Sequence, residues 1–209
     1  MLSVVGLCKV LGGRKVLDEV TFDVSPGRTL ALFGENGAGK STLLRILAGV
    51  MDADAGGATL DSDSLFGYPI TDRARIGYVP EAADAPPHMT PRELVGLVAS
   101  LKRSTLPDAS LFTRLGVDSY ADQHIGSLSL GQRRRSCLAA ALVGNVRLLL
   151  LDEPTNGLDV SGVTMLADVL SEHARSGGIS VVATHDEAFA TMTNAHRLRI
   201  AAGRVIGLD

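Results

Sequence analysis

The sequence predicts an α/β fold with an N-terminal antiparallel β segment and a small inserted helical lobe. Three observations support this fold class. The opening segment is rich in strand patterns, the apolar runs at 30–33 and 148–151 each end in a polar loop, and residues 85–134 have helical spacing without a strand. Alternating strands and helices on either side of a helical stretch are typical of a helix-covered sheet with one insertion.

The first half of the chain supplies strands and one helix of the core. Residues 20–24 alternate apolar and polar side chains as a half-buried strand does, and residues 30–33 form a second strand. A helical pattern over 42–48 follows. We expect further short strands at 58–60 and 76–79.

The inserted lobe has a clear helix start. Thr90 can cap a helix with Pro91 at its first position, and Glu93 can close a capping box. Beyond the lobe, we expect a helix from Ser161, and final strands on either side of a turn at Gly203.

The composition is that of one globular domain. The chain has 209 residues, 45% of them hydrophobic, and a formal net charge of -3, which gives no basic surface for nucleic acid. Its longest apolar stretches, at 138–143 and 148–151, are far shorter than the roughly 20 residues of a spanning helix. With no signal-peptide pattern at the N-terminus, we expect a cytoplasmic protein that does not bind nucleic acid.

A phosphate-binding loop lies between the strand at 30–33 and the helix at 42–48. Its glycines let backbone N–H groups point toward a polyphosphate, and the following helix presents its positive end. Lys40 can reach the β and γ phosphates, which places it among the catalytic residues, and Ser41 can ligate Mg²⁺. The predicted nucleotide-binding residues of this segment are Gly34, Glu35, Asn36, Gly37, Ala38, Gly39, Lys40, Ser41 and Thr42.

Two carboxylates follow the apolar run at 148–151. A strand of this kind is buried on both faces and delivers Asp152 and Glu153 at its C-terminal end, where open α/β sheets place their ligands. Asp152 can hold Mg²⁺ through water opposite Ser41. Glu153 can polarise a water for in-line attack on the γ phosphate.

Three further motifs point to a family. Residues 128–132 read Leu-Ser-Leu-Gly-Gln, residues 156–159 read Asn-Gly-Leu-Asp, and Thr184-His185-Asp186 follows a strand expected at 179–183. With the phosphate loop and the paired carboxylates, this set resembles the ATP-binding cassette (ABC) ATPases. The order of the motifs fits that family over essentially the whole chain.

The resemblance implies a fold, a partner cassette and further site residues. The fold is a single ABC ATPase domain over 1–209, a phosphate-loop (RecA-like) core at about 1–84 and 135–209 with a helical lobe at about 85–134. Two cassettes, alike or different, would pair head to tail around ATP. His185 would hold the γ phosphate and Asp159 would lie near the dimer axis. The signature residues that would touch the partner's ATP are Ser129, Leu130, Gly131 and Gln132.

Three positions depart from the family pattern. Leu11 stands where an aromatic residue usually stacks on adenine, so it offers only apolar contact. Glu81 replaces the usual glutamine at the junction into the lobe, where it can still ligate Mg²⁺ but cannot donate a hydrogen bond. Leu130 replaces the first signature glycine. The three arginines at 133–135 are expected to form a solvated or ion-paired helix face.

We therefore expect a Mg²⁺-dependent ATPase that powers transport through a separate integral membrane permease subunit. By analogy with the family, export is favoured over import, and the cassette would be peripheral on the inner face of the cell membrane. These motifs do not specify the transported substrate. Two alternatives stay open: a soluble ABC ATPase of translation or DNA repair, and an ATP-binding regulatory cassette with little turnover.

Overall fold

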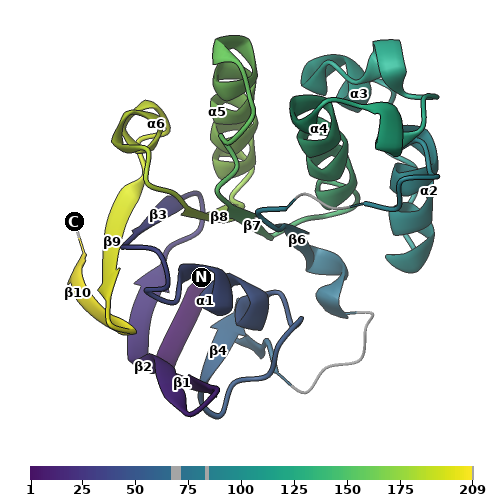
Figure 1. Ribbon diagram of the computed structural model, residues 1–209. Helices are drawn as coiled ribbons and strands as arrows, with labels where there is room; N and C mark the ends of the chain where they lie inside the picture. Colours follow the sequence, from purple (N-terminus) through teal and green to yellow (C-terminus); the bar gives the residue numbers. More distant parts are fainter. Residues whose placement is uncertain (67–71, 83–84, 209) are drawn as a thin grey trace.

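Two sheets and a set of helices make up the fold in the computed structural model, which describes residues 1–66, 72–82 and 85–208 (Figure 1). The strands are β1 (Leu2–Leu11), β2 (Arg14–Val24), β3 (Thr29–Phe33), β4 (Ala55–Leu60), β5 (Asp63–Ser64), β6 (Ile76–Val79), β7 (Leu148–Asp152), β8 (Ile179–Ala183), β9 (His196–Ala201) and β10 (Arg204–Leu208). The α-helices are α1 (Lys40–Leu47), α2 (Pro91–Leu101), α3 (Ser110–Leu115), α4 (Leu130–Ala141), α5 (Val160–Arg175) and α6 (Glu187–Met192). Short 3₁₀ turns are η1 (Asp72–Arg75), η2 (Asp118–Tyr120) and η3 (Ile125–Ser127).

The central sheet has the strand order β10-β9-β3-β8-β7-β6. Neighbouring strands from β9 to β6 run parallel, and β10 pairs antiparallel with β9 at one edge. Parallel strands end at the same edge of a sheet, so the loops that follow β3, β6, β7 and β8 lie together. The α/β fold class is confirmed.

The second sheet is antiparallel, with the order β2-β1-β4-β5, and confirms the predicted N-terminal β segment. Helix α1 lies between the two sheets (Figure 1). Its Leu43, Leu44 and Ile46 are fully buried in a core that takes side chains from both sheets. The helix after the phosphate loop is therefore enclosed on both sides.

The strand β7 is buried on both faces and contributes to two cores. Leu148 and Leu150 join the core around α1, whereas Leu149 and Leu151 face the core around α4 and α5. This alternation is the period of two expected for a strand between two layers. It explains why the sequence of β7 is continuously apolar.

Helices α2, α3 and α4 group beside the central sheet (Figure 1). The capping box at the start of α2 is confirmed: Thr90 Oγ1 accepts from the Glu93 amide at 3.2 Å, and Glu93 Oε2 accepts from the Thr90 amide at 2.8 Å. Helix α4 runs across the boundary expected near 134, and the division into core and lobe stays a prediction. Within the described ranges, no helix has the length and apolar character to cross a membrane.

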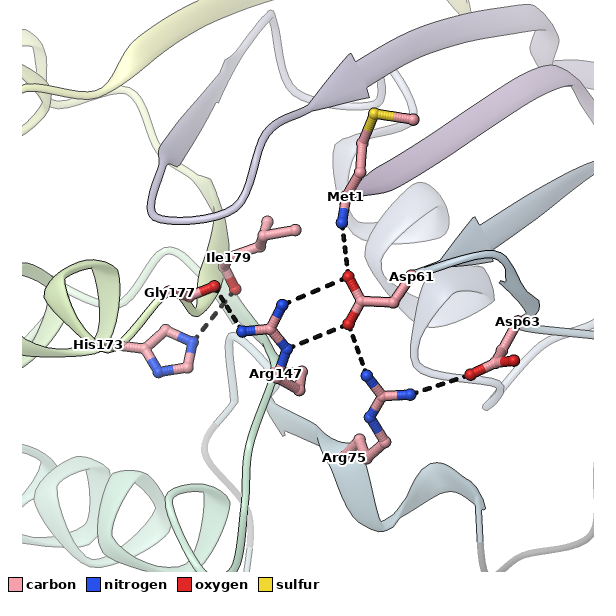
Figure 2. A network of polar contacts seen from close by, with 8 residues as sticks. All are labelled: Met1, Asp61, Asp63, Arg75, Arg147, His173, Gly177 and Ile179. Atoms are coloured by element: carbon pink, nitrogen blue, oxygen red, sulfur yellow. Dashed lines mark hydrogen bonds and ion pairs between the residues drawn. The ribbon is translucent and has the colours of Figure 1, made fainter.

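An ionic network joins the two sheets at the N-terminal ends of β6 and β7 (Figure 2). Asp61, in the turn between β4 and β5, accepts from Arg147 Nε at 3.1 Å and from Arg75 Nη2 at 2.6 Å. The amino group of Met1 lies 2.6 Å from the same carboxylate. These partners, Arg147 foremost, hold the pKa of Asp61 well below its usual range. Arg147 also donates to the Gly177 carbonyl at 2.7 Å, which extends the network to the turn before β8.

His173 packs beside this network as a buried neutral ring. Its Nε2 lies 3.3 Å from the Ile179 carbonyl, which can only accept, so Nε2 carries the proton. A Cβ built on Gly178 would lie 2.3 Å from the ring, so the imidazole lies directly against the backbone of that turn. Burial lowers the pKa of His173 below 6.5, and Arg147 lowers it further against the opposing hydrogen bond to Ile179.

The burial of His173 predicts a stability that depends on pH. Because the unfolded state takes up the proton first, the free energy of unfolding should fall as pH drops below about 6.5, by at most about 1.4 kcal/mol per pH unit for one group. His173→Gln keeps a donor for Ile179 without the titration, so its slope should be shallower in urea unfolding between pH 5 and 8. The control His196→Gln, at an exposed position of β9, should keep the wild-type slope. An unchanged slope in His173→Gln would contradict this account.

Candidate functional site

A cavity of about 520 Å³ opens where β3, β6, β7 and β8 end. A ligand site of 300–1,000 Å³ at the carboxyl ends of parallel strands is the expected place and size for a nucleotide. The cavity gathers most of the predicted site residues from four separate parts of the chain. Its lining comprises Val16, Glu35, Asn36, Gly37, Ala38, Gly39, Lys40, Ser41, Thr42, Glu81, Asp152, Glu153, Asn156 and His185.

The loop between β3 and α1 has a backbone that requires glycine at two positions. Gly37 and Gly39 have φ of 79° and 107°. A Cβ on Gly39 would also lie 2.7 Å from the Val16 carbonyl of β2. A Cβ on Gly34 would lie 2.3 Å from the Ile200 carbonyl of β9. The loop is thus held closely between the two sheets while its inner side faces the cavity.

Lys40 opens α1 and is almost fully buried. Its Nζ donates to the carbonyls of Gly34 at 2.7 Å and Glu35 at 3.3 Å, so the ammonium is held inside the curve of the loop. The N-cap of α1 is Gly39, and no side chain among the described residues caps the helix. The helix therefore presents its positive N-terminal end, with a cation beside it, to any anion in the cavity.

Asp152 ends β7 with 1% of its surface exposed, and neither carboxylate oxygen has a hydrogen-bond partner in the described structure. Burial raises its pKa, while the nearby Ser41 hydroxyl and the charges of Arg45 and Lys40 oppose the rise. A buried carboxylate without partners beside a hydroxyl is the donor set that fits Mg²⁺. Over the described ranges, no group of three or more His, Cys, Asp and Glu side chains could hold a metal ion by itself. A magnesium site here would accordingly take its remaining ligands from phosphate and water.

Glu153 follows with its backbone in the left-handed region, at φ 46°. Its carboxylate Oε2 lies 2.9 Å from Nδ1 of His185, which follows β8. The histidine side chain is 72% exposed, whereas Glu153 is largely buried. The pair therefore reaches from the buried floor of the cavity to its open side.

The signature segment lies outside this cavity. Ser129 caps α4 in a capping box: its hydroxyl accepts from the Gln132 amide at 3.2 Å, and Gln132 Oε1 accepts from the Ser129 amide at 2.9 Å. Leu130 is half exposed, and its Cδ2 would lie 2.7 Å from a Cβ built on Gly157. None of Ser129, Leu130, Gly131 and Gln132 lines the cavity. Their contact with a second cassette's ATP stays a prediction.

Asp159 is likewise outside the cavity, where it caps α5. Its Oδ1 accepts from the Gly162 amide at 2.8 Å and pairs with Arg135 Nη2 at 3.0 Å. The Gly162 amide and the Ser161 hydroxyl hold the pKa of Asp159 below its usual value. Arg135 thus connects α4 to the start of α5, as an ion-paired side chain should.

The expectation for Arg134 is wrong. Instead of lying on a solvated face, this side chain is 4% exposed and donates to two backbone carbonyls, those of Glu153 and, at 2.7 Å, Glu81. The run of three arginines suggested a uniform surface, but one turn of helix directs successive side chains in different directions. The middle one points into the protein.

Sequence reasoning also missed two residues of the cavity wall. Val16 reaches the cavity from β2, and no local pattern distinguishes it from other strand valines. Asn156 lies in a recognised motif, but its place on the wall depends on the turn after β7. Leu11 ends β1 with 39% of its surface exposed and is not part of the wall, so its contact with adenine stays a prediction.

Comparisons with known proteins identify the family of the chain. A family profile described as ABC transporter matches residues 17–156. The cytochrome c biogenesis ATP-binding export protein CcmA of Rhodopseudomonas palustris is 37% identical over 185 residues, which cover 88% of this chain and 91% of that relative. The Nod factor export ATP-binding protein I of Burkholderia pseudomallei is 38% identical over 82% of this chain, which spans only 58% of that relative. A solved ATP-binding subunit of an ABC transporter matches with a TM-score of 0.91 and 26% identity, covering 100% of this chain and 89% of that one.

The position of Leu11 yields a test of where the adenine lies. Leu11→Tyr should lower the dissociation constant for ATP about fivefold, because stacking of a base on an aromatic ring is worth roughly 1–3 kcal/mol. Titration with a fluorescent ATP analogue measures the change. Val10→Tyr is the matched control, since neighbouring residues of a strand point to opposite faces. Equal affinities in the two variants would place the adenine elsewhere.

Proposed function

The chain belongs to the ABC transporter family and is an ATP-binding ATPase of that family, and we propose that it hydrolyses ATP to power export through a separate membrane-spanning permease subunit. One observation carries the proposal. The phosphate loop, the carboxylates Asp152 and Glu153, and His185 all line one cavity although they come from distant parts of the chain. This is the arrangement needed for phosphoryl transfer from a nucleoside triphosphate to water.

The residues of the cavity would have different roles in ATP hydrolysis. The loop amides, the N-terminus of α1 and Lys40 would bind and orient the β and γ phosphates. Glu153 would accept the proton of the attacking water at its carboxylate, and His185, hydrogen-bonded to that carboxylate, would hold the γ phosphate on the open side.

Magnesium fits the same cavity. Ser41 would ligate it directly and Asp152 through water, and Glu81, which also lines the cavity, is the further candidate ligand. When bound, Mg²⁺ would neutralise charge that develops on the phosphate oxygens. In this chain, the buried carboxylate of Asp152 would gain the partner that it otherwise lacks.

Export and a membrane partner are supported by the relatives. Two similar proteins are named ATP-binding export proteins, and the chain covers 91% of one of them. The cassette would dock on the permease near Glu81 and the loop 85–89, where the nucleotide site meets α2. It would also pair with a second cassette, alike or different, through the exposed signature segment. In a cell, the cassette would then lie on the inner face of the membrane.

The first test separates ATP binding from turnover. Lys40→Ala should weaken ATP binding at least about tenfold, because it removes the cation from the phosphate loop. Glu153→Gln should keep ATP binding and lower steady-state hydrolysis about 10²–10⁴-fold, the usual contribution of a general base. Glu172→Gln, a surface change on α5, is the control and should match wild type. A wild-type rate of ATP hydrolysis in Glu153→Gln would show that Glu153 is not the general base. A wild-type protein that binds ATP without turnover would favour the regulatory cassette.

The second test concerns the membrane partner. Tagged cassette incubated with detergent extracts should recover a protein with several membrane-spanning segments. Ala85→Trp should lose that partner while retaining ATP binding, because the half-buried Ala85 lies in the loop proposed to dock. Ala109→Trp adds the same bulk at an exposed position before α3 and should retain the partner. Recovery of ribosomes or DNA, with no multispanning protein, would support the soluble alternative.

A further inference from the structure

Arg134 is a buried cation that is held by backbone carbonyls instead of a carboxylate. Its Nη1 donates to the Glu153 carbonyl and its Nη2 to the Glu81 carbonyl at 2.7 Å. Among the described residues, its buried Nε has no hydrogen-bond partner. Burial lowers the pKa of Arg134, with the nearby charges of Glu81, Asp152 and Glu153 opposing the effect. Burying a guanidinium without a carboxylate partner costs stability. Its retention is compatible with a need to hold this side chain in one position.

The carbonyl that Arg134 holds belongs to the residue proposed to activate water. Glu153 has φ of 46°, a conformation that costs a non-glycine residue on the order of 1–3 kcal/mol and needs support from its surroundings. Its amide donates to the Ala183 carbonyl of β8 at 2.9 Å, and its carbonyl accepts from the Asn156 amide at 3.3 Å as well as from Arg134. Arg134 is the only side chain among these supports of the Glu153 backbone.

The second carbonyl belongs to the junction after β6. Glu81 lines the cavity, and its backbone is joined by Arg134 to α4, the helix that begins at the signature serine Ser129. One planar guanidinium therefore fixes the relative positions of three segments: the signature helix, the junction and the end of β7. A lysine could not reproduce this, because its single ammonium lacks the flat fork that spans two acceptors.

We propose that Arg134 is a positioning residue for hydrolysis: it holds the backbone of Glu153 so that the carboxylate points at the attacking water. Because Arg134 belongs to the signature helix α4, it also links the orientation of this carboxylate to the position of that helix. This inference rests on the proposed function. Arg134 is not among the residues that line the cavity, so ATP binding should be independent of it. A misplacement of about 1 Å in a reacting group can cost 10²-fold in rate.

The experiment compares Arg134→Gln and Arg134→Lys with wild type in the full chain, using Mg²⁺-ATP. Steady-state kinetics, the dissociation constant of a fluorescent ATP analogue and thermal unfolding are measured for each. We expect kcat to fall between about tenfold and 10²-fold in both variants, with KM and the dissociation constant within about threefold of wild type. Arg114→Gln is the matched control, because Arg114 on α3 also connects its helix to a distant segment, through its pair with Glu172 of α5, and it should keep the wild-type kcat.

A second comparison asks whether Arg134 acts through Glu153. The double variant Arg134→Gln with Glu153→Gln should hydrolyse ATP no more slowly than Glu153→Gln alone, since the carboxylate to be positioned is already gone. Independent, multiplying losses would overturn the inference. So would a wild-type kcat in Arg134→Gln and Arg134→Lys, or an equal loss of ATP binding. If Arg134→Gln fails to fold, Arg134→Lys, which keeps the charge, decides by the same criteria. Absence of turnover in wild type would instead overturn the proposed function itself, and this inference with it.

Discussion

The burial of the central sheet on both faces is the constraint on which the site depends. A strand such as β7 must be apolar along its length, so polar groups can appear only where it ends. Because the neighbouring strands are parallel, their polar ends share one edge, and the cavity forms there. The same packing isolates Asp152 from water. The chemistry of the site therefore follows from the layers that enclose the sheet.

The two edges of the sheet use charge in opposite ways. At the N-terminal edge, Arg75 and Arg147 both pair with Asp61, and each oxygen of this carboxylate accepts a hydrogen bond in the network that joins the sheets (Figure 2). At the C-terminal edge, neither carboxylate oxygen of Asp152 has a hydrogen-bond partner among the residues that the structure describes, and Lys40 donates to two backbone carbonyls. Satisfied ion pairs contribute to structure, whereas unsatisfied buried groups cost stability and are retained where a ligand can satisfy them. The ion pairs at the N-terminal edge of the sheet therefore have a structural role, whereas the unpaired buried groups at the C-terminal edge mark the ligand site.

Local patterns predicted what depends on neighbours in sequence. The phosphate loop, the caps at Thr90 and the strand at β7 follow from spacing and residue type, so they could be predicted without coordinates. The S-x-x-Q spacing at Ser129 could also have predicted the capping box of α4. Val16 and Arg134 could not be assigned, because their roles depend on which distant backbone lies opposite them. A charged residue in a basic run gives no local sign that its partners will be two carbonyls far away in the chain.

The departures from the family pattern have different consequences in the fold. Leu130 does not enter the chain's own cavity: it is half exposed and lies against Gly157, a glycine at φ 78° that leaves room for it. Its bulk is therefore directed toward the surface where a second cassette would bind. Glu81 adds an acidic residue to a cavity that Glu35, Asp152 and Glu153 also line. Burial lowers the pKa of Arg134 and the charges of Glu81, Asp152 and Glu153 oppose that shift, so the acidic residue at position 81 helps to keep the buried guanidinium charged.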